Sequence, residues 1–150
     1  MSSPRLRAGL SQDAAGIRTL LESCGLPTSD LLSSNPQFIV ACEEAKIVAV
    51  GALQPFGSTA LLRSVAVASD LRGTGLGRII VQDLERIACA AGISRLVLLT
   101  ESAKPFFQRL GYQVIERKEV PQQVQASEEF RSLCPASATC MARTLAGSSA

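Results

Sequence analysis

The sequence of 150 residues contains no histidine, no tryptophan and a single tyrosine, Tyr112. The missing histidine excludes Ser-His-Asp and Cys-His catalysis within this chain, and it excludes zinc sites that need an imidazole ligand. The spacing between Cys134 and Cys140 is not a usual zinc spacing either, so we expect no metal site. Any proton transfer by the protein must use carboxylates, thiols, lysine, water or Tyr112.

Charge and hydropathy indicate which partners and which cellular location to expect. The 15 basic and 13 acidic residues give a net charge of +2 and are scattered, which argues against a nucleic-acid partner. The chain lacks both a signal peptide pattern and an apolar run of about 18 residues, so we expect no membrane association. Five cysteines without an export signal favour a reduced, cytoplasmic protein. With 47% hydrophobic residues, we expect one folded domain over residues 1–145 and a frayed tail over 146–150.

Hydrophobic periodicity predicts a mixed α/β fold with the order β-α-βββ-α-β-α-ββ. The first helix is expected to start with Ser11 as its N-cap and to end at Gly25. A turn is expected over 55–58, and single helical turns over 28–33 and 128–133. The remaining predicted elements are strands over 4–10, 37–42, 46–53, 59–68, 95–100, 112–116 and 139–145 and helices over 75–91 and 102–110.

A glycine-rich segment joins the strand over 59–68 to the long helix over 75–91. It reads Leu71-Arg72-Gly73-Thr74-Gly75-Leu76-Gly77-Arg78. Its glycines allow a sharp turn, the first amides of the helix favour a phosphate group, and the two arginines add positive charge. No Walker A string is present, and a G-x-G-x-x-G dinucleotide motif fails on spacing. The pattern Arg/Gln-x-x-Gly-x-Gly/Ala of an acyl-CoA loop is met by Arg72, Gly75 and Gly77.

Two segments resemble motifs of the GCN5-related N-acetyltransferase (GNAT) family. The segment from Val65-Ala66-Val67 to Gly77 resembles the family's motif A, and Phe106-Phe107-Gln108-Arg109-Leu110-Gly111-Tyr112 resembles its F-Y-x-x-x-G-F/Y motif. The resemblance implies the GNAT acyl-CoA N-acyltransferase fold, acetyl-CoA as acyl donor, and direct transfer of acetyl to the amine of a small molecule. It assigns the acetyl carbonyl to the backbone amides of Val65 and Val67. The implied acetyl-CoA contacts are Val65, Ala66, Val67, Arg72, Gly73, Thr74, Gly75, Leu76, Gly77, Arg78, Ser102 and Phe107.

The residue at the position of the catalytic acid differs from the family pattern. Phe107 stands where the family often has a tyrosine that protonates the leaving thiolate, and Ser102 replaces an asparagine. Tyr112 is a weak candidate for the acid, and packing of its ring in the core is favoured. The catalytic residues therefore stay unknown at this stage.

Two residues are candidates for contact with the acceptor substrate. Alternation along a strand puts Arg63 on one face with Val65 and Val67, among apolar neighbours where a charge needs a partner. It is either a clamp for a substrate anion or a member of a salt bridge. Thr100, at the end of the strand over 95–100, is the second candidate.

The tail from Pro121 to Met141, which contains Cys134 and Cys140, resembles that of ArsN-type acetyltransferases of arsenic-resistance operons. That resemblance implies an amino-acid-like or arsenical acceptor. Two other interpretations stay open, a non-catalytic acyl-CoA-binding module and a thiol-based arsenical-binding protein. The family resemblance also allows a homodimer.

Overall fold

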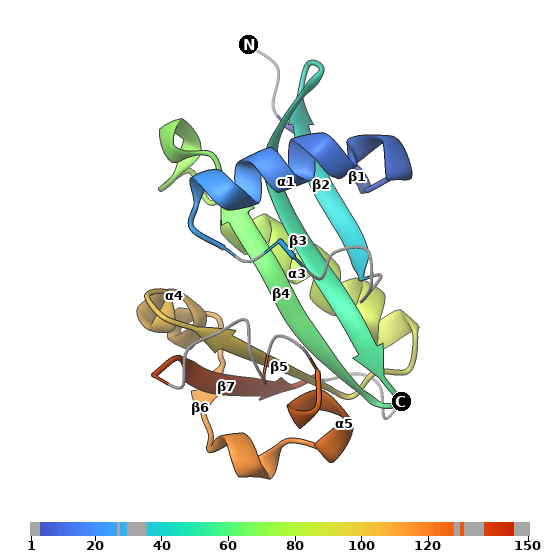
Figure 1. The fold of residues 1–150 in the computed structure, drawn as a ribbon, viewed down its shortest axis with the longest axis vertical. Helices are drawn as coiled ribbons and strands as arrows, with labels where there is room; N and C mark the ends of the chain where they lie inside the picture. The colour runs from blue at the N-terminus through green and yellow to red at the C-terminus, as the bar shows by residue number, and fades with distance from the viewer. Residues whose placement is uncertain (1–3, 27, 30–35, 128–129, 131–136, 146–150) are drawn as a thin grey trace. The chain divides into compact units, whose positions relative to one another are not determined.

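The computed structural model describes residues 4–26, 28–29, 36–127, 130 and 137–145. Strands and helices alternate in the predicted order, which confirms the mixed α/β fold (Figure 1). Hydrogen-bonded neighbours in the sheet follow the order β1-β2-β3-β4-β5-β7-β6. The strands are β1 (Arg5–Ala8), β2 (Gln37–Glu43), β3 (Lys46–Phe56), β4 (Thr59–Val67), β5 (Arg95–Thr100), β6 (Gln113–Val114) and β7 (Thr139–Thr144). The helices are α1 (Ala14–Ser23), α3 (Leu76–Ala90), α4 (Lys104–Arg109) and α5 (Gln122–Gln125), with 3-10 turns η1 (Ser11–Asp13), η2 (Ser69–Leu71) and η3 (Arg117–Glu119).

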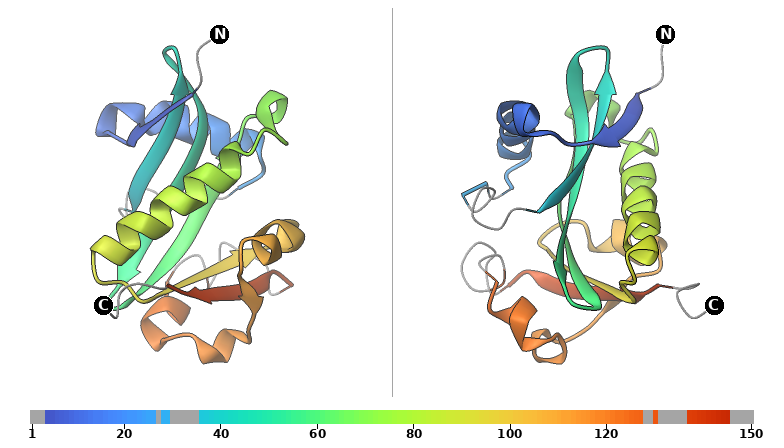
Figure 2. Two further views of the ribbon diagram at one scale, coloured as in Figure 1. Left: turned by 180° about the vertical axis from the view of Figure 1, so that it is seen from behind. Right: turned by 90° about the vertical axis from the view of Figure 1, so that its right-hand side faces the viewer.

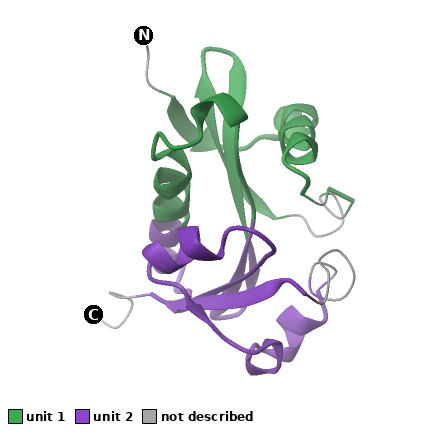
Figure 3. Cartoon of the chain, turned by 90° about the vertical axis from the view of Figure 1, so that its left-hand side faces the viewer, with its two compact units in different colours: residues 1–53, 64–84 green, residues 54–63, 85–150 purple. Residues whose placement is uncertain are grey.

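The chain divides into two compact units (Figure 3). Unit 1 comprises residues 1–53 and 64–84, and unit 2 comprises residues 54–63 and 85–150. The three boundaries between the units fall inside β3, β4 and α3, so each of these elements contributes residues to both units.

In unit 1, α1 and the first turns of α3 cover opposite faces of the β2–β3 hairpin (Figure 2). Strand alternation explains how both faces are filled. Val50 packs in the cluster under α1, whereas its neighbour Gly51 faces α3 so closely that a Cβ atom would lie 2.6 Å from Ile80 and 2.7 Å from Leu84. The cluster under α1 comprises Ile17, Leu20, Leu21, Val40, Val50 and Ala66.

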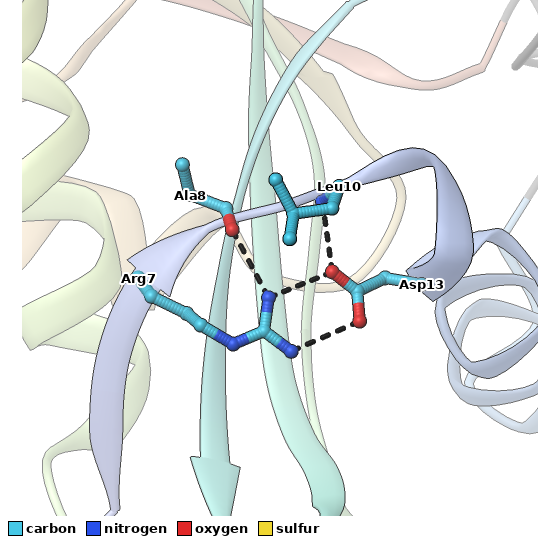
Figure 4. A network of polar contacts seen from close by, with 4 residues as sticks. All are labelled: Arg7, Ala8, Leu10 and Asp13. Atoms are coloured by element: carbon cyan, nitrogen blue, oxygen red, sulfur yellow. Dashed lines mark hydrogen bonds and ion pairs between the residues drawn. The ribbon is translucent and has the colours of Figure 1, made fainter.

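The start of α1 differs from the prediction. Ser11 is not the N-cap of an α-helix, because Ser11–Asp13 forms a 3-10 turn and α1 begins at Ala14. The Asp13 carboxylate instead organises this turn (Figure 4). It accepts hydrogen bonds from the Arg7 guanidinium at 2.7 and 2.9 Å and from the Leu10 amide at 2.8 Å. The bond from Arg7, followed by the one from Leu10, lowers the pKa of Asp13 to about 2.

In unit 2, β5 is the central strand. It pairs with β4 in parallel through Thr59–Leu61 and Arg95–Val97, and with β7 in antiparallel along its whole length. The two-residue strand β6 adds to the other side of β7. One apolar cluster of this unit comprises Leu61, Val97, Val120, Val124, Phe130, Cys140 and Ala142.

Several strands and helices begin or end at other residues than predicted. β3 continues through Pro55 to Phe56, so the predicted turn shrinks to Gly57 and Ser58. The predicted strand over 112–116 is reduced to β6, because the Tyr112 amide bonds back to the Phe107 carbonyl at the end of α4. The helical turns predicted over 28–33 and 128–133 lie mostly outside the described residues, and α5 was not predicted. No described helix is both long and apolar enough to span a membrane.

Candidate functional site

The end of β4 carries the strand amides that the family resemblance assigns to the acetyl carbonyl. Ser64 has a φ of +57°, in the left-handed region, which interrupts the regular strand. Beyond it, Val65 lies beside Gly51 on the α3 face, while Ala66 packs in the cluster under α1. Val65 and Ala66 therefore lie on opposite faces, whereas the predicted shared face of Arg63, Val65 and Val67 assumed a regular strand, which Ser64 interrupts. Pairing between β4 and β5 is confined to the three residue pairs that end at Leu61 and Val97.

The loop after β4 is a series of short turns. The Ala68 amide bonds to Val48, the Leu71 amide bonds to Ala68, and the hydroxyl and amide of Thr74 both bond to the Leu71 carbonyl. Gly73 and Gly75 have φ values of +83° and +88°, which residues with a side chain rarely adopt. Helix α3 then starts with the bond from the Ile79 amide to the Gly75 carbonyl.

The arrangement leaves the amides of Leu76, Gly77 and Arg78 ahead of the first helical hydrogen bond, where a helix favours an anion. A Cβ atom added at Gly73 or Gly75 would meet nothing within 4 Å, so the loop faces open space. Leu76 is buried and anchors the helix, while Arg78 is exposed in the first turn. The site can therefore accept a phosphate or pyrophosphate group on backbone amides.

The Arg72 side chain turns back onto β4. Its Nε donates to the Val67 carbonyl at 3.3 Å, and its Nη2 lies 3.3 Å from the Sγ of Cys24 at the end of α1. The contact joins positions 48 residues apart, so no pattern in the sequence indicated it.

In unit 2, the end of β5 leads into α4. The Thr100 hydroxyl accepts a hydrogen bond from the Ala103 amide at 3.0 Å, and Ser102 is exposed between them. Phe107 is buried and meets the Tyr112 ring edge-on, with 5.5 Å between centroids. These residues form a connected group around α4.

Tyr112 is 2% exposed, and its hydroxyl donates to Oε2 of Glu85 at 2.8 Å. The same oxygen accepts a hydrogen bond from Arg143 at 3.0 Å. Burial raises the pKa of Tyr112 well above its ordinary value, and the nearby charge of Glu85 raises it further. The hydroxyl is thus a weaker acid than a solvent-exposed tyrosine. Glu85 and Arg143 were not singled out by sequence, since only the fold brings them to Tyr112.

Arg63 is 3% exposed, and its Nη1 donates to Oε1 of Gln54 at 3.1 Å across β3 and β4. A buried charge at this position was predicted to need a partner, and Gln54 is one of its contacts.

Two observations concern metal ligands and thiols in the described part of the chain. No group of three or more histidine, cysteine, aspartate or glutamate residues there could hold a metal ion. Cys140 is a buried free thiol in β7, and burial raises its pKa. Cys134 lies outside the described residues.

Comparisons with known proteins agree with this geometry. A family model described as an acetyltransferase (GNAT) domain matches residues 34–114. A Bacillus subtilis protein described as an acetyltransferase is 32% identical over 117 residues, which cover 73% of this chain and 72% of that relative. Matches to two other curated relatives are shorter and span 40% and 58% of their lengths.

Solved structures share the fold. The Mycobacterium tuberculosis protein Rv2747, in complex with CoA, is 26% identical with a TM-score of 0.80, and the match covers 95% of this chain and 99% of that one. N-acetylglutamate synthase from Neisseria gonorrhoeae, complexed with coenzyme A and N-acetyl-glutamate, is 20% identical with a TM-score of 0.83. That match covers 98% of this chain and 36% of the synthase. The chain belongs to the GNAT acetyltransferase family.

Proposed function

We propose that this protein is an acetyl-CoA-dependent N-acetyltransferase that moves an acetyl group directly to the amine of a small molecule. The observation that carries the proposal is the corner from β4 to α3. Two glycines in the left-handed region form it, and the first amides of α3, which precede the first helical hydrogen bond, follow them in a chain of the GNAT family. The open space in front of Gly73 and Gly75 fits the close approach of a pyrophosphate.

The backbone supplies most of the chemistry in this proposal. When bound, acetyl-CoA supplies an activated thioester. The loop amides from Gly73 to Arg78, apart from the Thr74 amide that donates to Leu71, bind the pyrophosphate, and the exposed Arg78 adds positive charge. The amides of Val65 and Val67 hold the acetyl carbonyl and stabilise the negative charge that develops on its oxygen.

Proton transfer requires no dedicated side chain here. An ammonium with an ordinary pKa is about 0.1% neutral at pH 7, which costs about 4 kcal/mol for attack by the neutral amine. Phe107 carries no proton to donate, and Tyr112 already donates to Glu85 with a raised pKa. We therefore propose that water, or the proton released by the amine, protonates the leaving thiolate. Tyr112 has a structural role instead, in the packing of α4.

The acceptor in this proposal is an amino-acid-like compound or an arsenical analogue. Arg63 supplies a buried guanidinium suited to a carboxylate or another anion, and Thr100 supplies a hydroxyl. Two resemblances support this class. The Neisseria synthase is complexed with N-acetyl-glutamate, and the tail from Pro121 to Met141 resembles that of ArsN-type enzymes.

The test combines thermal unfolding with an acceptor screen. Acetyl-CoA at 100 times its Kd should stabilise the fold by about 2.7 kcal/mol, and an unmoved Tm would contradict the proposal. CoA release is then followed with amino acids, phosphinate and arsonate analogues, polyamines and protein N-termini. Stabilisation without CoA release on any amine would indicate a non-catalytic acyl-CoA-binding module. Binding of a trivalent arsenical that is lost in Cys134→Ser would indicate a thiol-based arsenical-binding protein.

A further inference from the structure

Three groups of unit 1 meet at the end of β4. The Arg72 guanidinium donates to the Val67 carbonyl through Nε and contacts the Cys24 thiol through Nη2, both at 3.3 Å. The Cys24 thiol itself lies 3.8 Å from the same carbonyl and can donate to it. We call the Cys24 and Arg72 side chains together the β4 clasp.

The clasp holds the peptide at which the strand becomes the loop. Its carbonyl, that of Val67, contacts both side chains of the clasp, and its N–H, that of Ala68, donates to the Val48 carbonyl at 2.8 Å. In the adjoining peptide, the Ala68 carbonyl accepts the next turn bond from the Leu71 amide, so the clasped peptide lies directly before the first turn of the loop. Cys24 is in turn fixed, because it is partly buried against the cluster under α1.

We propose that Cys24 and Arg72 are positioning residues for acyl-CoA, and that Arg72 acts through the Val67 carbonyl rather than as a ligand of the phosphates. The inference rests on the proposed function. Two donors of the planar guanidinium are committed to Val67 and Cys24, which a lysine ammonium on a flexible stem cannot reproduce. The amides of the loop, and not the charge of Arg72, then recognise the pyrophosphate.

Two substitutions of Arg72 separate positioning from charge. Arg72→Gln keeps an N–H donor for the Val67 carbonyl and loses the charge, whereas Arg72→Lys keeps the charge and loses the planar fork. We expect Arg72→Lys to weaken acetyl-CoA binding more than Arg72→Gln, with a loss of about three- to tenfold for the lysine variant. Calorimetry of acetyl-CoA binding measures this order. The opposite order would overturn the proposal, because it would mean that charge on the phosphates matters most.

The cysteine is tested against a matched control. Cys42 is also partly buried against the cluster under α1, so Cys42→Ala loses similar packing without touching the clasp. We expect Cys24→Ala to raise the KM for acetyl-CoA about three- to tenfold with kcat unchanged, Cys24→Ser to recover most of this loss, and Cys42→Ala to leave KM unchanged. Equal KM values for the two alanine variants would overturn the clasp. Wild-type protein that does not bind acetyl-CoA would overturn the proposed function itself.

Discussion

At the scale of single residues, the Tyr112 hydroxyl makes a structural hydrogen bond that its position in the motif did not predict. It donates to a carboxylate that Arg143 also pairs with, so one oxygen of Glu85 links α3, the turn after α4, and β7. A hydroxyl fixed in this way is poorly placed to protonate the thiolate that leaves during acetyl transfer.

Replacement of Tyr112 by phenylalanine tests this assignment. The ring contact with Phe107 is kept and the hydroxyl is lost, so we expect destabilisation of about 1.5–3 kcal/mol from the lost bond to a charged acceptor. We expect kcat to change by less than about tenfold, whereas loss of a general acid would cost about 10²–10⁴. Urea unfolding and steady-state kinetics on the same preparation measure both quantities. A fall in kcat of the larger size with normal stability would make Tyr112 the acid.

The raised pKa of Tyr112 also predicts how stability depends on alkaline pH. Above about pH 10 an unfolded tyrosine loses its proton, while the buried one keeps it, so unfolding releases a proton and stability falls as pH rises. Because the chain has one tyrosine, the ultraviolet absorbance of tyrosinate reports this residue alone. Comparison with Tyr112→Phe, which lacks this contribution, removes the effect of lysine titration.

Asp13 predicts the opposite dependence at acid pH. Its pKa of about 2 lies below that of an unfolded aspartate, so the stability it contributes is present above about pH 4 and is lost as pH falls towards 2. We expect Asp13→Asn to unfold more easily at neutral pH and to lose less stability on acidification. Urea unfolding of both proteins between about pH 2 and pH 7 measures this difference, and equal losses of stability on acidification would contradict the prediction.

At the scale of elements, the loop between β4 and α3 depends on backbone conformation more than on side chains. Gly75→Ala forces an L residue into the left-handed region at a cost of about 1–2 kcal/mol, and it tilts the amides that start α3. We expect acetyl-CoA binding to weaken about tenfold or more, since displaced donors lose most of their effect.

Gly57 provides the matched control for that prediction. It has a φ of +70° in the β3–β4 turn, and an added Cβ would also meet nothing within 4 Å. Gly57→Ala should therefore lose a similar stability and keep wild-type affinity for acetyl-CoA, as measured by calorimetry. Equal loss of affinity in both variants would mean that the effect of Gly75→Ala is only instability.

The elements also show what could be predicted from sequence. β5 has the predicted bounds, and α3 differs from the predicted helix by one residue at each end, because long regular hydrophobic patterns determine both. The left-handed backbone of Ser64 left no sequence signal, since glycine or asparagine is the usual residue there. The contacts of Arg72 with Cys24 and of Tyr112 with Glu85 join distant positions, so only the fold could bring them together.

At the scale of the whole molecule, the two compact units share three continuous elements. Because β3, β4 and α3 each pass from one unit to the other, unfolding of one unit would shorten a helix and two strands. The single domain over residues 1–145 stays a prediction, which the cooperativity of unfolding tests.

We therefore expect one cooperative unfolding transition. Tyr112 is the only tyrosine and there is no tryptophan, so intrinsic fluorescence reports on unit 2, whereas far-ultraviolet circular dichroism reports on both units. The two urea transitions should coincide. A tyrosine transition displaced from the dichroism transition would show that the units unfold separately.

The two edge strands of the sheet, β1 and β6, affect whether molecules associate at high concentration. A net charge of +2 gives little long-range repulsion between molecules, so protection against strand-to-strand association must be local. At one end, β1 presents the exposed Arg5 and Arg7, and at the other, β6 is only two residues long. A charged edge and a short edge both resist the addition of a further strand. Resistance to strand-to-strand association therefore depends on a few residues at the sheet edges rather than on the overall charge.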